Sequence, residues 1–150
     1  MRVHLSSALL IVHLAVITGC KTPERIPFSA VECPEDRALV YVYWGKFWAK
    51  ADNLTISVNA KRVASLHSPG YYPLILEPGV VQLGYSVQVH PIFPINVGKT
   101  ISLTLPVESG KTYYVAYRPW NGGWWPQLVL VDAAVGETEI AKCTLGKVYE

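Results

Sequence analysis

Strict alternation of apolar and polar residues runs through three segments of this 150-residue chain and restricts what it can fold into. Apolar side chains recur at every second position in residues 54–58, 81–89 and 101–105. A period of two places one face of a strand on a core and the other in water, whereas an amphipathic helix repeats every three to four residues. These segments therefore predict half-buried β-strands.

Five further stretches are also strand-like but more evenly apolar, which indicates strands that are central or better covered: Arg37 to Tyr43, Arg62 to Leu66, Tyr71 to Leu76, Lys111 to Arg118 and Gln127 to Val131. Turn-forming residues at 59–61, 77–79 and 108–110 separate several of them. About eight short strands predict one all-β domain over residues 37–150, an antiparallel β-sandwich of immunoglobulin-like or prealbumin-like type. Near the end, Glu137, Glu139, Ile140 and Cys143 suit a short helix that closes at Gly146.

The N-terminus has the organisation of a secretory signal peptide, with a basic start and an apolar stretch over residues 5–17. The run Ile17-Thr18-Gly19-Cys20 resembles the lipobox of bacterial lipoproteins. An ordinary cleaved signal would carry a small residue in place of Ile17, and a membrane-spanning anchor needs about 20 apolar residues. We expect removal of residues 1–19 and acylation of Cys20 with fatty acids such as palmitate. Lys21 follows where inner-membrane lipoproteins usually carry aspartate, so the resemblance implies an outer-membrane protein that faces the periplasm.

Residues 20–36 contain proline and glutamate without periodicity, which predicts a flexible tether between the lipidated cysteine and the domain. Cys33 and Cys143 are the two cysteines that acylation of Cys20 leaves. A pair in an oxidising compartment predicts a disulfide. Two buried free thiols remain the alternative, because spacing in sequence does not define the geometry that a disulfide needs.

Several short motifs of the domain look like those of a family of bacterial lipoproteins that share the domain of unknown function 2846. The likeness covers about residues 37–131 and is carried by Ala38-Leu39-Val40-Tyr41-Val42-Tyr43, Ile56-Ser57-Val58-Asn59, Val63-Ala64-Ser65-Leu66, Gly70-Tyr71-Tyr72, Glu77-Pro78-Gly79 and Gly110-Lys111-Thr112-Tyr113-Tyr114. The resemblance implies a small β-sandwich on a lipid tether and brings no catalytic residues with it. Family members often have a basic residue where this chain has Trp44.

The predicted connections separate into two kinds. If consecutive strands reverse direction, the short turns fall at one end of the sandwich and the connections 44–53, 67–70, 90–98 and 118–126 at the other. All five tryptophans lie in two of these connections. We therefore predict an interaction surface formed by Trp44, Phe47, Trp48, Phe93, Trp120, Trp124 and Trp125. The alternative is that these rings fold back as a lid on the core.

The charge and the polar residues favour binding over catalysis. A formal net charge of +2 gives no support for nucleic-acid binding. The carboxylates are scattered, and His67 and His90 have no third ligand at short spacing, so the sequence predicts no enzyme, metal or cofactor. We expect a lipid-anchored envelope protein of structural or protein-binding type, attached to the membrane through Cys20 and bound to an envelope protein. The alternative is a periplasmic carbohydrate- or lipid-binding module that uses the same aromatic end.

Overall fold

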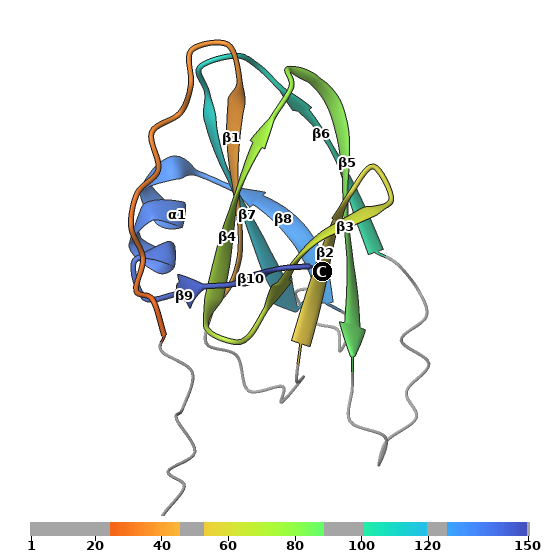
Figure 1. Ribbon diagram of the computed structural model, residues 1–150, viewed down its shortest axis with the longest axis vertical. Coiled ribbons are helices and arrows are strands. Elements are labelled where there is room, and N and C mark those ends of the chain that lie inside the picture. The colour runs from red at the N-terminus through yellow and green to blue at the C-terminus, as the bar shows by residue number, and fades with distance from the viewer. Residues whose placement is uncertain (1–24, 46–52, 89–100, 120–125, 150) are drawn as a thin grey trace, which may run out of the picture.

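The computed structural model describes residues 25–45, 53–88, 101–119 and 126–149. Its elements are β1 (Ala38–Trp44), β2 (Asn53–Val58), β3 (Lys61–Leu66), β4 (Gly70–Leu76), β5 (Gly79–Gln88), β6 (Ile101–Val107), β7 (Thr112–Pro119), β8 (Pro126–Val131), α1 (Ala133–Ile140), β9 (Thr144–Leu145) and β10 (Lys147–Val148). The first sheet has the order β8-β7-β1-β4-β9 and the second the order β10-β3-β2-β5-β6 (Figure 1). The predicted all-β sandwich is confirmed, whereas its immunoglobulin-like or prealbumin-like type stays a prediction.

Each of the eight strands expected from the sequence corresponds to one of β1 to β8. The chain alternates between the sheets, because β1, β4, β7 and β8 lie in the first and β2, β3, β5 and β6 in the second. As a result, β7 lies beside β1 and runs parallel to it, and β9 likewise runs parallel to β4. The sandwich therefore differs from the wholly antiparallel prediction in these two pairings.

Strand β1 is buried along its whole length, as its evenly apolar sequence predicted. Ala38, Val40, Val42 and Trp44 belong to the core between the two sheets. The alternate residues Leu39, Tyr41 and Tyr43 belong to a second hydrophobic cluster. Because successive side chains of a strand point to opposite faces, one strand contributes to both clusters.

The second cluster lies on the outer face of the first sheet, beneath α1 and the segment that precedes β1 (Figure 1). Tyr71 and Tyr114 come from the sheet, Ile140 from α1 and Phe28 from the preceding segment. The molecule thus has a third layer over one sheet. This layer keeps water from a face that would otherwise expose several aromatic rings.

The predicted C-terminal helix is shorter than expected, since α1 ends at Ile140 and not at Gly146. The residues beyond it form β9 and β10, which pair with β4 and β3 in different sheets. A Cβ atom on Gly146 would lie 2.4 Å from Leu66 Cδ2 and 2.8 Å from the Ser65 carbonyl oxygen. Glycine is needed there because the chain crosses from one sheet to the other in close contact with β3.

Replacing Gly136 by alanine is expected to destabilise the fold although alanine favours helices. An added Cβ would lie 2.3 Å from Tyr114 Cγ, so α1 or the ring must shift. Overpacking of this kind costs about 1–3 kcal/mol, whereas the gain in helix propensity is about 1 kcal/mol. Urea unfolding measures the difference, with Thr138→Ala on the exposed face of α1 as the control. Higher stability of Gly136→Ala would contradict the close packing of α1 on β7.

Candidate functional site

Four connections of the sandwich leave from one end, which we call the loop end, and the short turns lie at the opposite, far end (Figure 1). In the first sheet, Trp44 pairs with Gly70 and Pro119 with Pro126 at the loop end. In the second sheet, the strand ends Asn53 and Gln88 pair there. The strand directions on which the aromatic surface was predicted are therefore correct.

The residues of the predicted surface divide into one that the structure describes and six that it does not. Phe47, Trp48, Phe93, Trp120, Trp124 and Trp125 lie outside the described residues. Trp44 is 1% exposed and forms part of the core between the sheets. Its assignment to an interaction surface was wrong. The sequence contained the signal, because Trp44 continues the two-residue phase of Ala38, Val40 and Val42.

Trp44 belongs to an aromatic group that fills the core at the loop end. Its ring meets Tyr117 edge-on at 5.5 Å, and Tyr117 meets Tyr85 edge-on at 4.7 Å. The Tyr85 hydroxyl donates to the Pro126 carbonyl oxygen at 2.7 Å, and burial raises the pKa of Tyr85. Trp44 Nε1 is buried and finds no acceptor within the described part of the chain. The three rings come from β1, β5 and β7 and fill the core at the loop end.

The segment predicted to be a flexible tether is packed on the first sheet from its first described residues onward. Phe28 meets Tyr41 edge-on at 5.7 Å and Tyr71 at 5.1 Å. The Val31 amide donates to the Tyr41 hydroxyl at 2.8 Å, and the Ser29 amide to the Tyr71 hydroxyl at 3.2 Å. The predicted tether boundary at residue 36 was wrong, since tyrosine hydroxyls satisfy backbone groups that a free tether would leave to water.

One carboxylate joins α1 to the first sheet. Glu139 Oε2 accepts from the Tyr43 hydroxyl at 2.6 Å and from Arg118 Nη2 at 2.5 Å. Burial acts to raise the pKa of Glu139, but the hydrogen bonds from Tyr43 and Arg118 outweigh it and lower that pKa. The carboxylate is therefore held ionised as an acceptor, and this arrangement serves to dock α1.

Glu139→Ala is expected to lower the free energy of unfolding by about 1–3 kcal/mol, because it leaves the buried Tyr43 hydroxyl without this acceptor. Glu139→Gln is the matched control, since its amide oxygen can still accept from Tyr43.

The contribution of Glu139 to stability should also depend on pH. Because the pKa of Glu139 is lowered on folding, its contribution to the free energy of unfolding is present above the ordinary glutamate pKa and is lost as the pH falls through the lowered value. Denaturation series at neutral and acidic pH should show a pH-dependent loss in the wild type that Glu139→Gln lacks. An equal pH dependence would contradict this role.

Cys33 and Cys143 are free thiols in the structure, so the predicted disulfide was wrong. Cys33 Sγ lies 3.6 Å from the Arg37 carbonyl oxygen, whereas Cys143 Sγ lies 4.0 Å from that of Trp44. These carbonyls mark opposite ends of β1, about 23 Å apart at 3.3 Å per residue, which places the sulfurs on the order of 15 Å apart. Both cysteines touch the second hydrophobic cluster but at its two ends, and burial raises the pKa of the Cys143 thiol to about 11.

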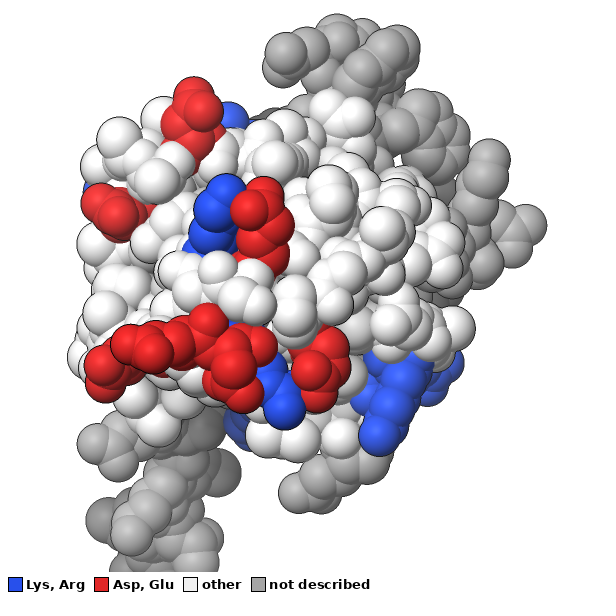
Figure 2. Space-filling model, turned by 90° about the horizontal axis from the view of Figure 1, so that it is seen from above, with Lys and Arg blue, Asp and Glu red and all other residues white. Residues whose placement is uncertain are grey.

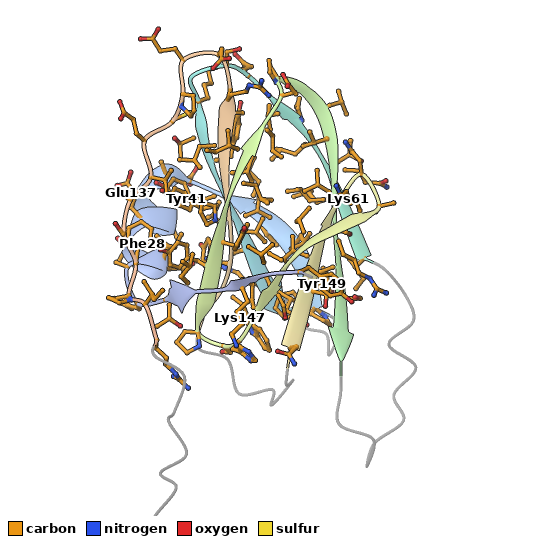
Figure 3. All side chains as sticks on the ribbon, in the orientation of Figure 1. Phe28, Tyr41, Lys61, Glu137, Lys147 and Tyr149 are labelled. Atoms are coloured by element: carbon orange, nitrogen blue, oxygen red, sulfur yellow. The ribbon has the colours of Figure 1, made fainter. Side chains whose placement is uncertain are left out.

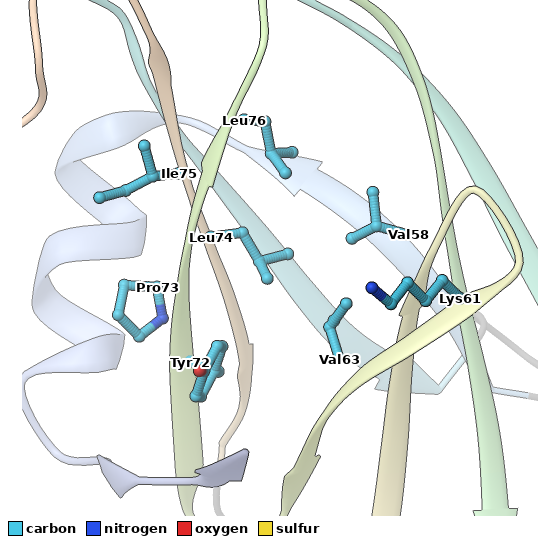
Figure 4. Close-up of a pocket in the computed structure, with 8 residues that line it drawn as sticks. All are labelled: Val58, Lys61, Val63, Tyr72, Pro73, Leu74, Ile75 and Leu76. Atoms are coloured by element: carbon cyan, nitrogen blue, oxygen red, sulfur yellow. The ribbon is translucent and has the colours of Figure 1, made fainter. Parts of the chain in front are cut away.

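A shallow apolar hollow of about 500 Å³ lies between β3 and β4, where the two sheets part (Figure 4). Lys61 extends across it from β3 toward β4. Its lining consists of Val58, Lys61, Val63, Tyr72, Pro73, Leu74, Ile75 and Leu76. It offers apolar contact area and one ammonium group rather than an acid–base pair.

The edge of β4 beside this hollow is protected against strand addition. β9 pairs only with Gly70 and Tyr71, so the rest of β4 has no neighbour on that side among the described strands. The Tyr71 carbonyl accepts from the Gly146 amide at 2.7 Å, which shows that odd-numbered residues direct their backbone groups to this edge. Pro73 has the same phase and lacks an N–H donor. Proline at such a position blocks pairing with another chain.

The described residues contain no group of three histidine, cysteine, aspartate or glutamate side chains that could hold a metal ion. Of the two histidines considered for such a site, His67 is exposed beside the loop end and His90 lies outside the described residues. Within the described ranges, no helix is long and apolar enough to cross a membrane.

Comparison of the chain with protein-family models, with curated proteins and with solved structures finds no match. The resemblance to lipoproteins with the domain of unknown function 2846 therefore stays a prediction.

Proposed function

We propose that this protein is a lipid-anchored component of the bacterial cell envelope, attached to the outer membrane through Cys20 and facing the periplasm. It acts by binding rather than by catalysis, and its contact surface is the loop end of the sandwich. The partner at that end is an envelope protein in the first interpretation and a lipid or carbohydrate in the alternative.

The observation that carries this proposal is the convergence of connections at the loop end. Three of the four lead into segments rich in aromatic residues, which include Trp48, Phe93 and Trp125. Aromatic side chains supply large contact areas and dominate the energetics of binding surfaces. Trp44, Tyr85 and Tyr117 already fill the core beneath this end.

The anchor is tested by Cys20→Ser in the full chain. We expect this variant to lose incorporation of a palmitate analogue and to leave the membrane fraction or remain unprocessed, because it removes the only acylation site that the lipobox offers. Cys33→Ser is the matched control and should keep both the label and the membrane location. Label that persists in Cys20→Ser would overturn the lipoprotein assignment.

The binding surface is tested by photo-crosslinking from its rim in intact cells. A crosslinker in place of Gln127, next to the loop end of β8, should yield discrete adducts with an envelope component. The same crosslinker in place of Val80, which is 72% exposed at the far end, is the control. Adducts from Val80 alone would contradict the assignment of the loop end as the contact surface.

A further inference from the structure

The chain enters the sandwich at its loop end. The Ile26 carbonyl oxygen accepts from the Leu145 amide at 2.8 Å, and Leu145 pairs with Tyr71 next to the start of β4. That start, Gly70, lies opposite Trp44, the last residue of β1. Cys20 stands six residues before Ile26, so even a fully extended chain places it within about 20–22 Å of Ile26.

The residues between Ile26 and β1 run along the sandwich to the far end and add no length to the anchor. Phe28 packs on Tyr41 and Tyr71, and the Cys33 thiol donates to the Arg37 carbonyl at the start of β1. β1 alone spans about 23 Å. The extended limit of about 20–22 Å between Cys20 and Ile26 is shorter than this span. The short linker therefore favours an orientation in which the loop end, and not the far end, lies next to the acylated Cys20.

The two ends also differ in charge. The far end carries the carboxylates Glu35, Asp36, Glu77 and Glu108 and three cations, Arg37, Lys111 and, on the β2–β3 turn, Lys61; Arg37 and Lys111 are ion-paired to carboxylates. Figure 2 looks onto this end and shows most of the acidic side chains gathered over one part of it, with basic side chains among them and to one side. At the loop end, the described cations are Arg25, Arg118, Lys142 and Lys147. They face one described carboxylate, Glu139, which is paired with Arg118.

We infer that the loop end lies against the anionic surface of the bilayer that holds the acyl chains of Cys20, with the far end directed away from it. This inference rests on the proposed function, because it requires acylation of Cys20. Of the partners proposed for the loop end, it takes the lipid alternative, a phospholipid surface, in place of an envelope protein. Basic side chains are attracted to anionic headgroups within about a Debye length, about 8–10 Å, and carboxylates are repelled. The linker and the charges thus select the same orientation independently.

The orientation is tested with the processed, lipidated full chain in vesicles of phosphatidylethanolamine and phosphatidylglycerol that contain a headgroup spin label. A fluorescent probe is attached to Lys147→Cys at the loop end or to Ser109→Cys at the far end, both in a Cys33→Ser background. Cys143 is 2% exposed and stays unlabelled. The two probes lie on the order of 20 Å apart along the strands, so we expect quenching at position 147 to be about threefold stronger or more.

Each result has a defined meaning. Equal quenching of the two probes, or stronger quenching at position 109, overturns the orientation while the anchor stands. The intact mass of the purified chain is measured first, and a mass without acyl groups on Cys20 overturns the proposed function instead. Exchange of phosphatidylglycerol for zwitterionic phosphatidylcholine should reduce the difference between the probes. An unchanged difference overturns the assignment of an anionic surface.

Discussion

Trp44→Ala is expected to lower the free energy of unfolding by about 3–5 kcal/mol, the range for truncation of a buried large aromatic residue. Trp44 is 1% exposed, and its ring packs edge-on against Tyr117 at 5.5 Å. Its removal leaves a cavity beside Tyr117 at the loop end of the core. Thermal and urea unfolding of the variant measure the loss.

Trp44→Phe is the matched control for this change. It retains an aromatic ring against Tyr117 and removes Nε1, which has no acceptor among the described residues. We expect this variant to lose much less stability than Trp44→Ala. A near-neutral Trp44→Ala variant would show that the ring lies outside the core and would restore it to the interaction surface.

Tyr41→Ala should have a comparable effect on the other face of β1, again about 3–5 kcal/mol. Tyr41 is 2% exposed and stacks on Tyr114 at 5.4 Å, and it also contacts Phe28 and Tyr71. Its loss removes the ring on which the segment before β1 packs. We expect this variant both to unfold more easily and to be cut by proteases within residues 25–36.

Tyr41→Phe separates the ring from its hydroxyl. It keeps the packing with Tyr114 and loses the hydrogen bond from the Val31 amide, which should cost about 0.5–1.5 kcal/mol. Proteolysis of residues 25–36 should stay slow in Tyr41→Phe. If Tyr41→Ala resisted proteolysis as well as the wild type, the docked segment would depend on other contacts.

The eight main strands could be predicted from the sequence because each is long enough to display its period or its apolar run. The evenly apolar sequence of β1 correctly indicated that this strand is covered on both of its faces. β9 and β10 could not be predicted, since two residues each display no period. The parallel pairing of β1 with β7 depends on how the chain crosses between sheets, which local patterns do not encode.

The docking of residues 25–36 was missed because its contacts are irregular. Two apolar side chains, Phe28 and Cys33, and backbone amides bound to the Tyr41 and Tyr71 hydroxyls hold a segment that has no periodicity. The disulfide prediction failed for a related reason. Two remaining cysteines in an oxidising compartment predicted a bond between Cys33 and Cys143. The fold places them at opposite ends of β1, which the number and spacing of cysteines in the sequence do not encode.

The order of residues 25–36 decides how the anchor meets the domain, and amide hydrogen exchange in the lipidated full chain measures it most directly. We predict slow exchange at the amides of Ser29 and Val31, which donate to tyrosine hydroxyls, and of Leu145, which donates to Ile26. Tyr41→Phe should accelerate exchange at Val31 more than at Leu145. Exchange of Ser29 and Val31 at the rate of an unstructured peptide would show a free tether, and the loop end would then have no fixed relation to the membrane.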